Sequence, residues 1–63
     1  MERHSNLLTY DEAAKLLRLH PVTLRRLVSQ RRIPFVKIGR SVRFVLEDLI
    51  QWIKDHRFPG DDE

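Results

Sequence analysis

Two helix-start signals lie close together in the first third of the chain. Thr9 and Glu12 have the spacing of a capping box, in which each side chain accepts a hydrogen bond from the backbone amide of the other residue. Pro21 suits the first position of a second helix, because the amide that proline lacks would have no partner there. These signals predict a first helix over about residues 10–17 and a second helix from Pro21. Only residues 18–20 remain to connect them, so two short helices must follow one another through a tight turn.

The apolar residues of both predicted helices recur at helical spacing, which predicts one core-facing side for each helix. They are Tyr10, Ala13, Ala14 and Leu17 in the first helix, and Leu24, Leu27 and Val28 in the second. On a helical wheel, the face opposite the second stripe carries Val22, Arg26 and Ser29, with Thr23 and Arg25 on its flanks. We expect that face to be polar, basic and free to bind a partner.

After Gln30 the apolar residues change from helical to alternating spacing, which predicts a hairpin of two strands. The outer face of the hairpin would carry Lys37 and Arg43, and its tip would lie at Gly39-Arg40. The other face would carry apolar side chains from both strands, which a connection at residues 39–41 would join. These side chains are Val36, Ile38, Val42 and Phe44.

A third helix is predicted over about residues 46–55, with Leu49, Trp52 and Ile53 as its buried stripe. An isolated hairpin is only marginally stable in water, so the hairpin must lie on the helices. Trp52 is the single tryptophan of the chain and the expected centre of that packing.

The positive charge is concentrated in the middle of the chain. Lys and Arg total 12 and Asp and Glu total 9, yet the nine basic residues between Ala13 and Leu46 have no acid among them. A segregated positive field attracts a polyanion, because each neutralised phosphate releases condensed counterions. We therefore expect nucleic acid as the partner. The nine are Lys15, Arg18, Arg25, Arg26, Arg31, Arg32, Lys37, Arg40 and Arg43.

At 63 residues the chain is expected to form one small domain over residues 7–55, with a flexible N-terminus at 1–6 and a flexible acidic tail at 56–63. It has no cysteine, and its three histidines lack metal-ligand spacing, so we expect no disulfide, metal or cofactor. No apolar run approaches the roughly 20 residues of a membrane span. These features predict a soluble, cytoplasmic protein.

The sequence offers no set of residues for catalysis. Glu47 and Asp48 are adjacent, so on a helix they point about 100° apart, and as first-turn acids they complement the helix dipole. Neither a Ser-His-acid set nor a phosphate-binding loop occurs. We therefore expect a binding protein and not an enzyme.

Four segments, in order and with the expected spacing, resemble the excisionase-type small DNA-binding domains, which are relatives of the DNA-binding half of MerR-type regulators. They are residues 8–17 (LTYDEAAKLL), 20–28 (HPVTLRRLV), 33–40 (IPFVKIGR) and 47–53 (EDLIQWI). The resemblance implies a winged helix-turn-helix, mainly α with a small β-hairpin: a helix-turn-helix, a two-stranded wing and a C-terminal helix. The second helix would lie in the major groove, and the wing would reach the minor groove or the phosphates. The matching positions are Thr23, Arg25 and Arg26 on the second helix, and Lys37, Arg40 and Arg43 on the wing.

The chain also departs from the family it resembles. Arg18 and Arg31 stand where members usually carry glycine, so either the backbone differs there or each arginine adopts a left-handed conformation at a cost of about 1 kcal/mol. His20 replaces the usual serine cap of the second helix and is a poorer acceptor, and Val45 stands where a proline often opens the last helix.

We expect a sequence-specific double-stranded DNA-binding protein, and the resemblance implies an architectural factor that bends DNA in site-specific recombination and contacts an integrase or recombinase. A small transcriptional regulator at an operator, near RNA polymerase, is the alternative. In either role we expect copies to associate on DNA. Outside DNA binding, the alternatives are an adaptor whose basic face docks on an acidic protein and an RNA binder, the latter disfavoured by the few aromatic residues. The residues expected to contact DNA are Val22, Thr23, Arg25, Arg26, Ser29, Arg31, Arg32, Lys37, Arg40 and Arg43.

Overall fold

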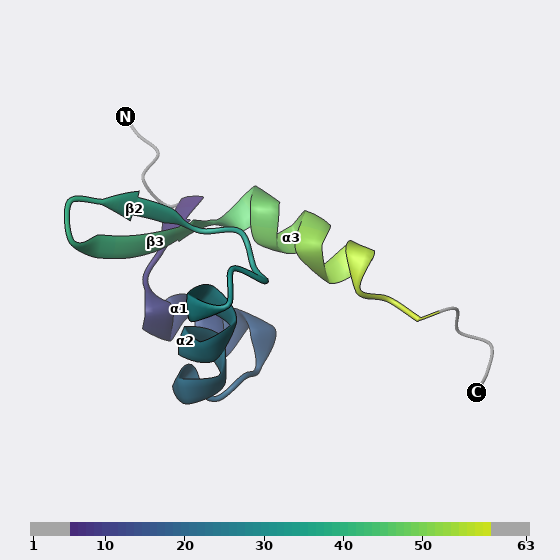
Figure 1. The fold of residues 1–63 in the computed structure, drawn as a ribbon. Helices are drawn as coiled ribbons and strands as arrows, with labels where there is room; N and C mark the ends of the chain where they lie inside the picture. The colour runs from purple at the N-terminus through teal and green to yellow at the C-terminus, as the bar shows by residue number, and fades with distance from the viewer. Residues whose placement is uncertain (1–5, 59–63) are drawn as a thin grey trace.

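The computed structural model describes residues 6–58, which form three helices and three short strands (Figure 1). In chain order the elements are β1 (Leu7–Leu8), α1 (Tyr10–Leu17), α2 (Pro21–Ser29), β2 (Val36–Ile38), β3 (Ser41–Val45) and α3 (Leu46–Asp55). The predicted winged helix-turn-helix is confirmed: α1 and α2 form the helix-turn-helix, the β2–β3 hairpin is the wing, and α3 follows it. The segments predicted to be flexible are 1–6 and 56–63. Most of each, residues 1–5 and 59–63, lies outside the described residues.

Helix α1 begins at the predicted capping box. The Thr9 hydroxyl accepts a hydrogen bond from the Glu12 amide at 3.2 Å, and the Glu12 carboxylate accepts one from the Thr9 amide at 2.9 Å. The first turn is therefore fixed by residues adjacent in sequence. From it the helix turns its inner face to the core, where Ala13 and Ala14 are buried.

Helix α1 ends in a Schellman motif with Arg18 at the left-handed position, where φ is 56° and ψ is 41°. The Leu19 amide donates to the Ala14 carbonyl at 3.0 Å, and the Arg18 amide donates to the Lys15 carbonyl at 3.2 Å. Glycine is usual at this position because it lacks the Cβ that crowds the neighbouring carbonyl oxygen. Of the two outcomes that the sequence left open, the structure shows the strained one.

Helix α2 ends in the same way, with Arg31 at a φ of 56°. The Arg32 amide donates to the Leu27 carbonyl at 2.9 Å, and the Arg31 amide donates to the Val28 carbonyl at 3.0 Å. Both helix ends thus keep the conformation that glycine favours, and each carries a cation in its place.

Replacing Arg18 by glycine should stabilise the domain. The change removes the left-handed strain but gives the unfolded chain more freedom, so the free energy of unfolding should rise by about 0.5–1 kcal/mol. Urea titration followed by circular dichroism measures it. Arg18→Ala is the matched control, because it removes the same charge but keeps a Cβ, and it should give no gain. An equal gain from both variants would mean that the charge of Arg18, and not its backbone conformation, costs stability.

Helix α2 has a side-chain cap despite the missing serine. The His20 Nδ1 accepts a hydrogen bond from the Val22 amide at 3.1 Å. This bond requires an Nδ1 that carries no proton. Pro21 occupies the first turn as predicted, so the start of α2 is defined by both residues.

The sheet has three strands and not the predicted two, in the antiparallel order β1–β3–β2. Leu7 pairs with Val45, and Leu8 pairs with Phe44. A strand of two residues is too short to show an alternating pattern in the sequence. Strand β1 makes β3 the central strand and joins the start of α1 to the wing.

The register of β2 and β3 contradicts the predicted basic outer face of the wing. Lys37 pairs with Val42, and Val36 pairs with Arg43. Directly paired residues of antiparallel strands have their side chains on the same face of the sheet. Lys37 therefore lies on the face of Val42, and Arg43 lies on the opposite face.

The length of the hairpin loop explains this error. With a three-residue connection at 39–41, the apolar residues of both strands would share one face of the hairpin. In the structure Ile38 pairs with Ser41, so only Gly39 and Arg40 connect the two strands. Gly39 has a φ of 61°, which the first position of a two-residue type II′ turn requires. A shift of one residue moves every side chain of a strand to the other face.

The core centres on Phe44 and not, as predicted, on Trp52. Phe44, Leu24 and Leu49 are the largest fully buried side chains, and they come from β3, α2 and α3. Trp52 is partly buried at the edge of this cluster, and Ile53, predicted to be buried, is 40% exposed. The predicted stripes of α1 and α2 do enter the core: Ala13, Ala14, Leu24 and Val28 are buried, and Tyr10, Leu17 and Leu27 pack against them.

Helix α3 follows β3 without a break. Val45 is its N-cap residue and makes no side-chain cap hydrogen bond. Glu47 and Asp48 lie in its first turn, where acids favour the positive end of the helix dipole. Figure 1 shows α3 leading away from the tip of the hairpin, so the wing and α3 occupy opposite ends of the molecule.

Candidate nucleic-acid interface

The outer face of α2 is exposed, as the helical wheel predicted. Val22, Arg26 and Ser29 are all exposed, and Val22 is exposed over 55% of its surface. The Ser29 hydroxyl donates to the Arg26 carbonyl at 2.9 Å, which turns it back onto the helix. An exposed helix can enter the major groove, where arginine forks to guanine and an apolar side chain contacts the methyl group of thymine.

The two flanks of this face differ in exposure. Thr23 is half-buried, whereas Arg25 is exposed. The guanidinium carbon of Arg25 lies 4.5 Å from the centre of the Tyr10 ring, a cation–π contact between α2 and α1. The Tyr10 ring in turn meets the Phe44 ring edge-on, with 5.3 Å between centres and 77° between planes. No feature of the sequence pattern marked Tyr10 as part of the interface.

The segment after α2 carries two exposed cations on a backbone that is held in place. Arg31 and Arg32 are both exposed. The Arg32 carbonyl accepts a hydrogen bond from the indole nitrogen of Trp52 at 2.9 Å, and Ile33, the next residue, is buried. The two side chains can therefore reach outward from a fixed main chain.

The three cations predicted on the wing are not equivalent. Arg40 lies exposed in the turn, and Lys37 is exposed on β2. Arg43 is half-buried, and its guanidinium donates to the Val42 carbonyl at 2.8 Å. Arg40 and Lys37 are thus free to meet a phosphate, whereas Arg43 is partly engaged with the main chain.

The candidate residues fall into three groups: the outer face of α2, the segment that follows α2, and the wing. Figure 1 shows the turn between β2 and β3 projecting past α1 and α2. None of the three groups contains an acid, so their fields add. Within residues 6–58 the acids lie at the start of α1 and on α3: Asp11, Glu12, Glu47, Asp48 and Asp55.

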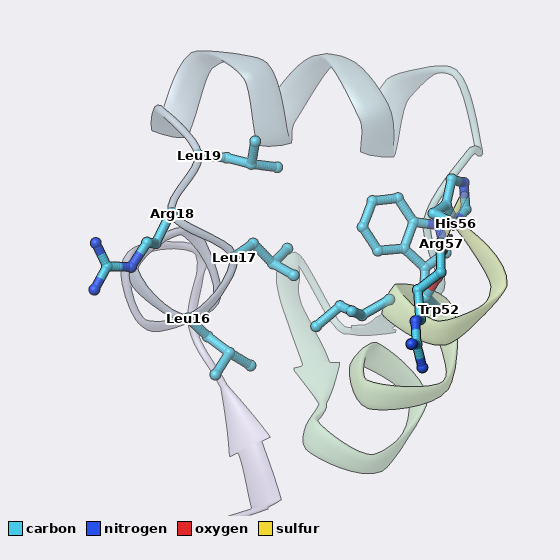
Figure 2. A pocket seen from close by; sticks show the side chains of 8 residues that line it. Leu16, Leu17, Arg18, Leu19, Trp52, His56 and Arg57 are labelled. Atoms are coloured by element: carbon cyan, nitrogen blue, oxygen red, sulfur yellow. Dashed lines mark hydrogen bonds between the residues drawn. The ribbon is translucent and has the colours of Figure 1, made fainter. Parts of the chain in front are cut away.

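A mostly apolar groove of about 460 Å³ lies between the turn after α1 and the C-terminal half of α3 (Figure 2). Leu17 and Leu19 point into it, Trp52 closes the other side, and Arg18 points away. Leu16, also in the lining, is 45% exposed and lies beside the apolar stripe of α1. The sequence pattern did not predict this groove. The lining has no carboxylate, hydroxyl or thiol.

Two further findings bear on other kinds of site. Among the residues that the structure describes, no three His, Cys, Asp or Glu side chains are grouped to hold a metal ion. None of the helices formed by residues 6–58 is long and apolar enough to cross a membrane.

Similarity to known proteins indicates the family of this chain. A family model described as a helix-turn-helix domain matches residues 7–57, which include every helix and strand of the described structure. A protein of Mycobacterium tuberculosis named "Putative antitoxin VapB50" is 44% identical over 55 residues, or 87% of this chain. The chain spans only 42% of the length of that relative. No solved structure matches the chain.

Proposed function

The chain belongs to the helix-turn-helix domain family, and from this premise we propose that it is a non-enzymatic protein that binds double-stranded DNA in a sequence-specific manner. The observation that carries the proposal is the outer face of α2, where Arg26 and Val22 are exposed and no acid occurs on the helix. A face of this kind fits the major groove, where base pairs present distinct donors and acceptors. Base reading by α2 would supply the sequence preference.

The cations that flank α2 would contact the DNA backbone. Arg31 and Arg32 follow the end of α2, and Arg40 lies at the turn of the wing. Phosphate contacts of this kind set the register and orientation of the protein but carry no sequence information. A guanidinium at the wing turn also suits a narrowed minor groove, where A·T-rich DNA concentrates negative potential.

The role that we propose first is architectural, of the excisionase type. Bound copies would bend DNA beside a recombination site and contact an integrase or recombinase. One small module buries only about 600–1,000 Å² on DNA, so tight occupancy needs several copies on neighbouring sites. A circular-permutation assay on DNA with one site and with tandem sites would show a bend that grows with occupancy. Unbent DNA at full occupancy would exclude this role.

The second candidate is a small transcriptional regulator that occupies an operator close to RNA polymerase. The relative at 44% identity is named "Putative antitoxin VapB50", a name that gives no recombination role and so leaves the regulator open. A reporter gene placed behind the selected DNA site distinguishes the two roles. Repression or activation that depends on the site, without bending, would support the regulator.

DNA binding should weaken steeply as salt is added. With about four to six phosphates contacted, log affinity should fall against log salt with a slope of about −4 to −5. Fluorescence anisotropy of a duplex selected from random sequences, titrated at several NaCl concentrations, measures the slope.

Poly-glutamate and a duplex of random sequence are the controls for that titration. Sequence-specific binding requires a tighter complex with the selected duplex than with the random one at every salt concentration. A flat salt series, or equal affinity for poly-glutamate and for DNA, would favour the adaptor that docks on an acidic protein.

A further inference from the structure

We propose that Tyr10 is a positioning residue that holds the guanidinium of Arg25 ready to read DNA. A side chain of α1 would then set part of the sequence selectivity of α2 without itself contacting the DNA. This inference rests on the proposed function and concerns the same interface.

The contact between Arg25 and Tyr10 restrains an otherwise mobile side chain. Arg25 is exposed on the flank of α2, and its guanidinium carbon lies 4.5 Å from the centre of the Tyr10 ring. A cation within about 6 Å of an aromatic face is attracted by the ring quadrupole. The ring therefore favours one of the many rotamers that a free arginine would sample.

The Tyr10 ring is itself held on two sides. Its edge-on neighbour, Phe44, is 0% exposed and belongs to the central strand β3. Tyr10 is also the first residue of α1, directly after Thr9, whose capping box fixes the start of the helix. The Tyr10 ring that lies under Arg25 is thus part of the folded core, so it does not move with α2 alone.

Stacking leaves the hydrogen-bonding capacity of Arg25 intact. A guanidinium uses its flat face on the ring, while its N–H donors lie in its plane and stay available to a base or a phosphate. Binding then costs less entropy, because the side chain is ordered before the DNA arrives. This gain in affinity arises only on DNA that presents a hydrogen-bond acceptor where the Tyr10 ring holds the guanidinium of Arg25.

Arg26 serves as an internal comparison. It lies one residue further along α2 and is also exposed. Among residues 6–58, however, it is Arg25 and not Arg26 that lies over an aromatic ring. Its side chain projects about 100° around the helix from that of Arg25. A change at Tyr10 should therefore act on Arg25 and leave Arg26 unaffected.

The test compares Tyr10→Phe, which keeps the ring, with Tyr10→Leu, which removes it. Affinities for the selected and the random duplex are measured at a temperature where circular dichroism shows each variant folded. Tyr10→Leu should weaken binding to the selected duplex about threefold to tenfold and change binding to the random duplex much less. Tyr10→Phe should bind like the original chain.

Double variants separate positioning from a general structural role. In an Arg25→Ala background, Tyr10→Leu should cause no further loss of selectivity, whereas in an Arg26→Ala background it should cause its full loss. The NMR signals of the Arg25 side chain in the DNA-free protein give a second readout. They should be shifted by the ring current in the original chain and in Tyr10→Phe, and should return to ordinary values in Tyr10→Leu.

Three outcomes would overturn the proposal: undiminished selectivity in Tyr10→Leu, the same loss on both duplexes, or a loss that persists without Arg25. If Tyr10→Leu does not fold, the NMR signals of the Arg25 side chain in the DNA-free original chain decide, because a guanidinium held over the Tyr10 ring is shifted by the ring current. Signals at ordinary values would then reject the positioning role. If the original chain itself shows no preference between duplexes, the proposed function fails, and not the positioning role alone.

Discussion

Phe44→Ala is expected to leave the domain largely unfolded at room temperature. Phe44 is 0% exposed, lies on the central strand β3 and supports the ring of Tyr10. Truncating a buried phenylalanine costs about 3–5 kcal/mol, because it removes apolar contacts and leaves a cavity. The core of a chain of this size without cysteine rarely supplies more than about 3–5 kcal/mol in total.

Thermal unfolding followed by circular dichroism measures this effect, with Phe58→Ala as the matched control. Phe58 is 89% exposed, so the same truncation there should leave the melting curve unchanged. A cooperative melt of Phe44→Ala close to that of the original chain would contradict the placement of Phe44 at the centre of the core.

Arg26→Ala should weaken binding to the cognate DNA site by about 1–3 kcal/mol and binding to random DNA much less. The reason is that a bidentate contact to a base exists only where the right base is present. Competition titrations with both duplexes, on protein shown to be folded, measure the two losses side by side.

Lys37→Ala is the comparison variant for this experiment. Lys37 is exposed on β2 and not part of α2, so it can contact phosphate but does not lie on the helix that we propose to read bases. Its loss should weaken both duplexes alike and flatten the salt slope by about one unit. Equal losses from Arg26→Ala on both duplexes would reduce Arg26 to a phosphate contact.

The helices of this chain could be predicted from the sequence because their signals are local. Each signal acts within a few residues: the capping box at Thr9 and Glu12 for α1, and Pro21 for α2. Both helices begin where these signals predict. The exposed face of α2 follows from the same periodicity, because a helix has one geometry wherever it occurs. Which residues of that face contact DNA stays a prediction.

The wing could be predicted only in outline. Alternation correctly placed β2 and β3, but the faces of Lys37 and Arg43 depended on whether the connection had two residues or three. The sequence pattern is compatible with both, because each strand alternates correctly by itself. In the folded chain the two strands pair through a two-residue turn, which places Lys37 and Arg43 on opposite faces of the sheet.

Sequence patterns alone were enough to predict the set of helices, the positive middle of the chain and the outer face of α2. The folded chain was needed to show that β1 completes the sheet, that Phe44 and not Trp52 is the centre of the core, and that Arg25 lies over Tyr10. Helix signals act between neighbours along the chain, where the backbone leaves few alternatives. The contacts of Phe44, Trp52 and Arg25 join segments far apart in sequence, and their partners are chosen by packing among surfaces that form only when the elements come together.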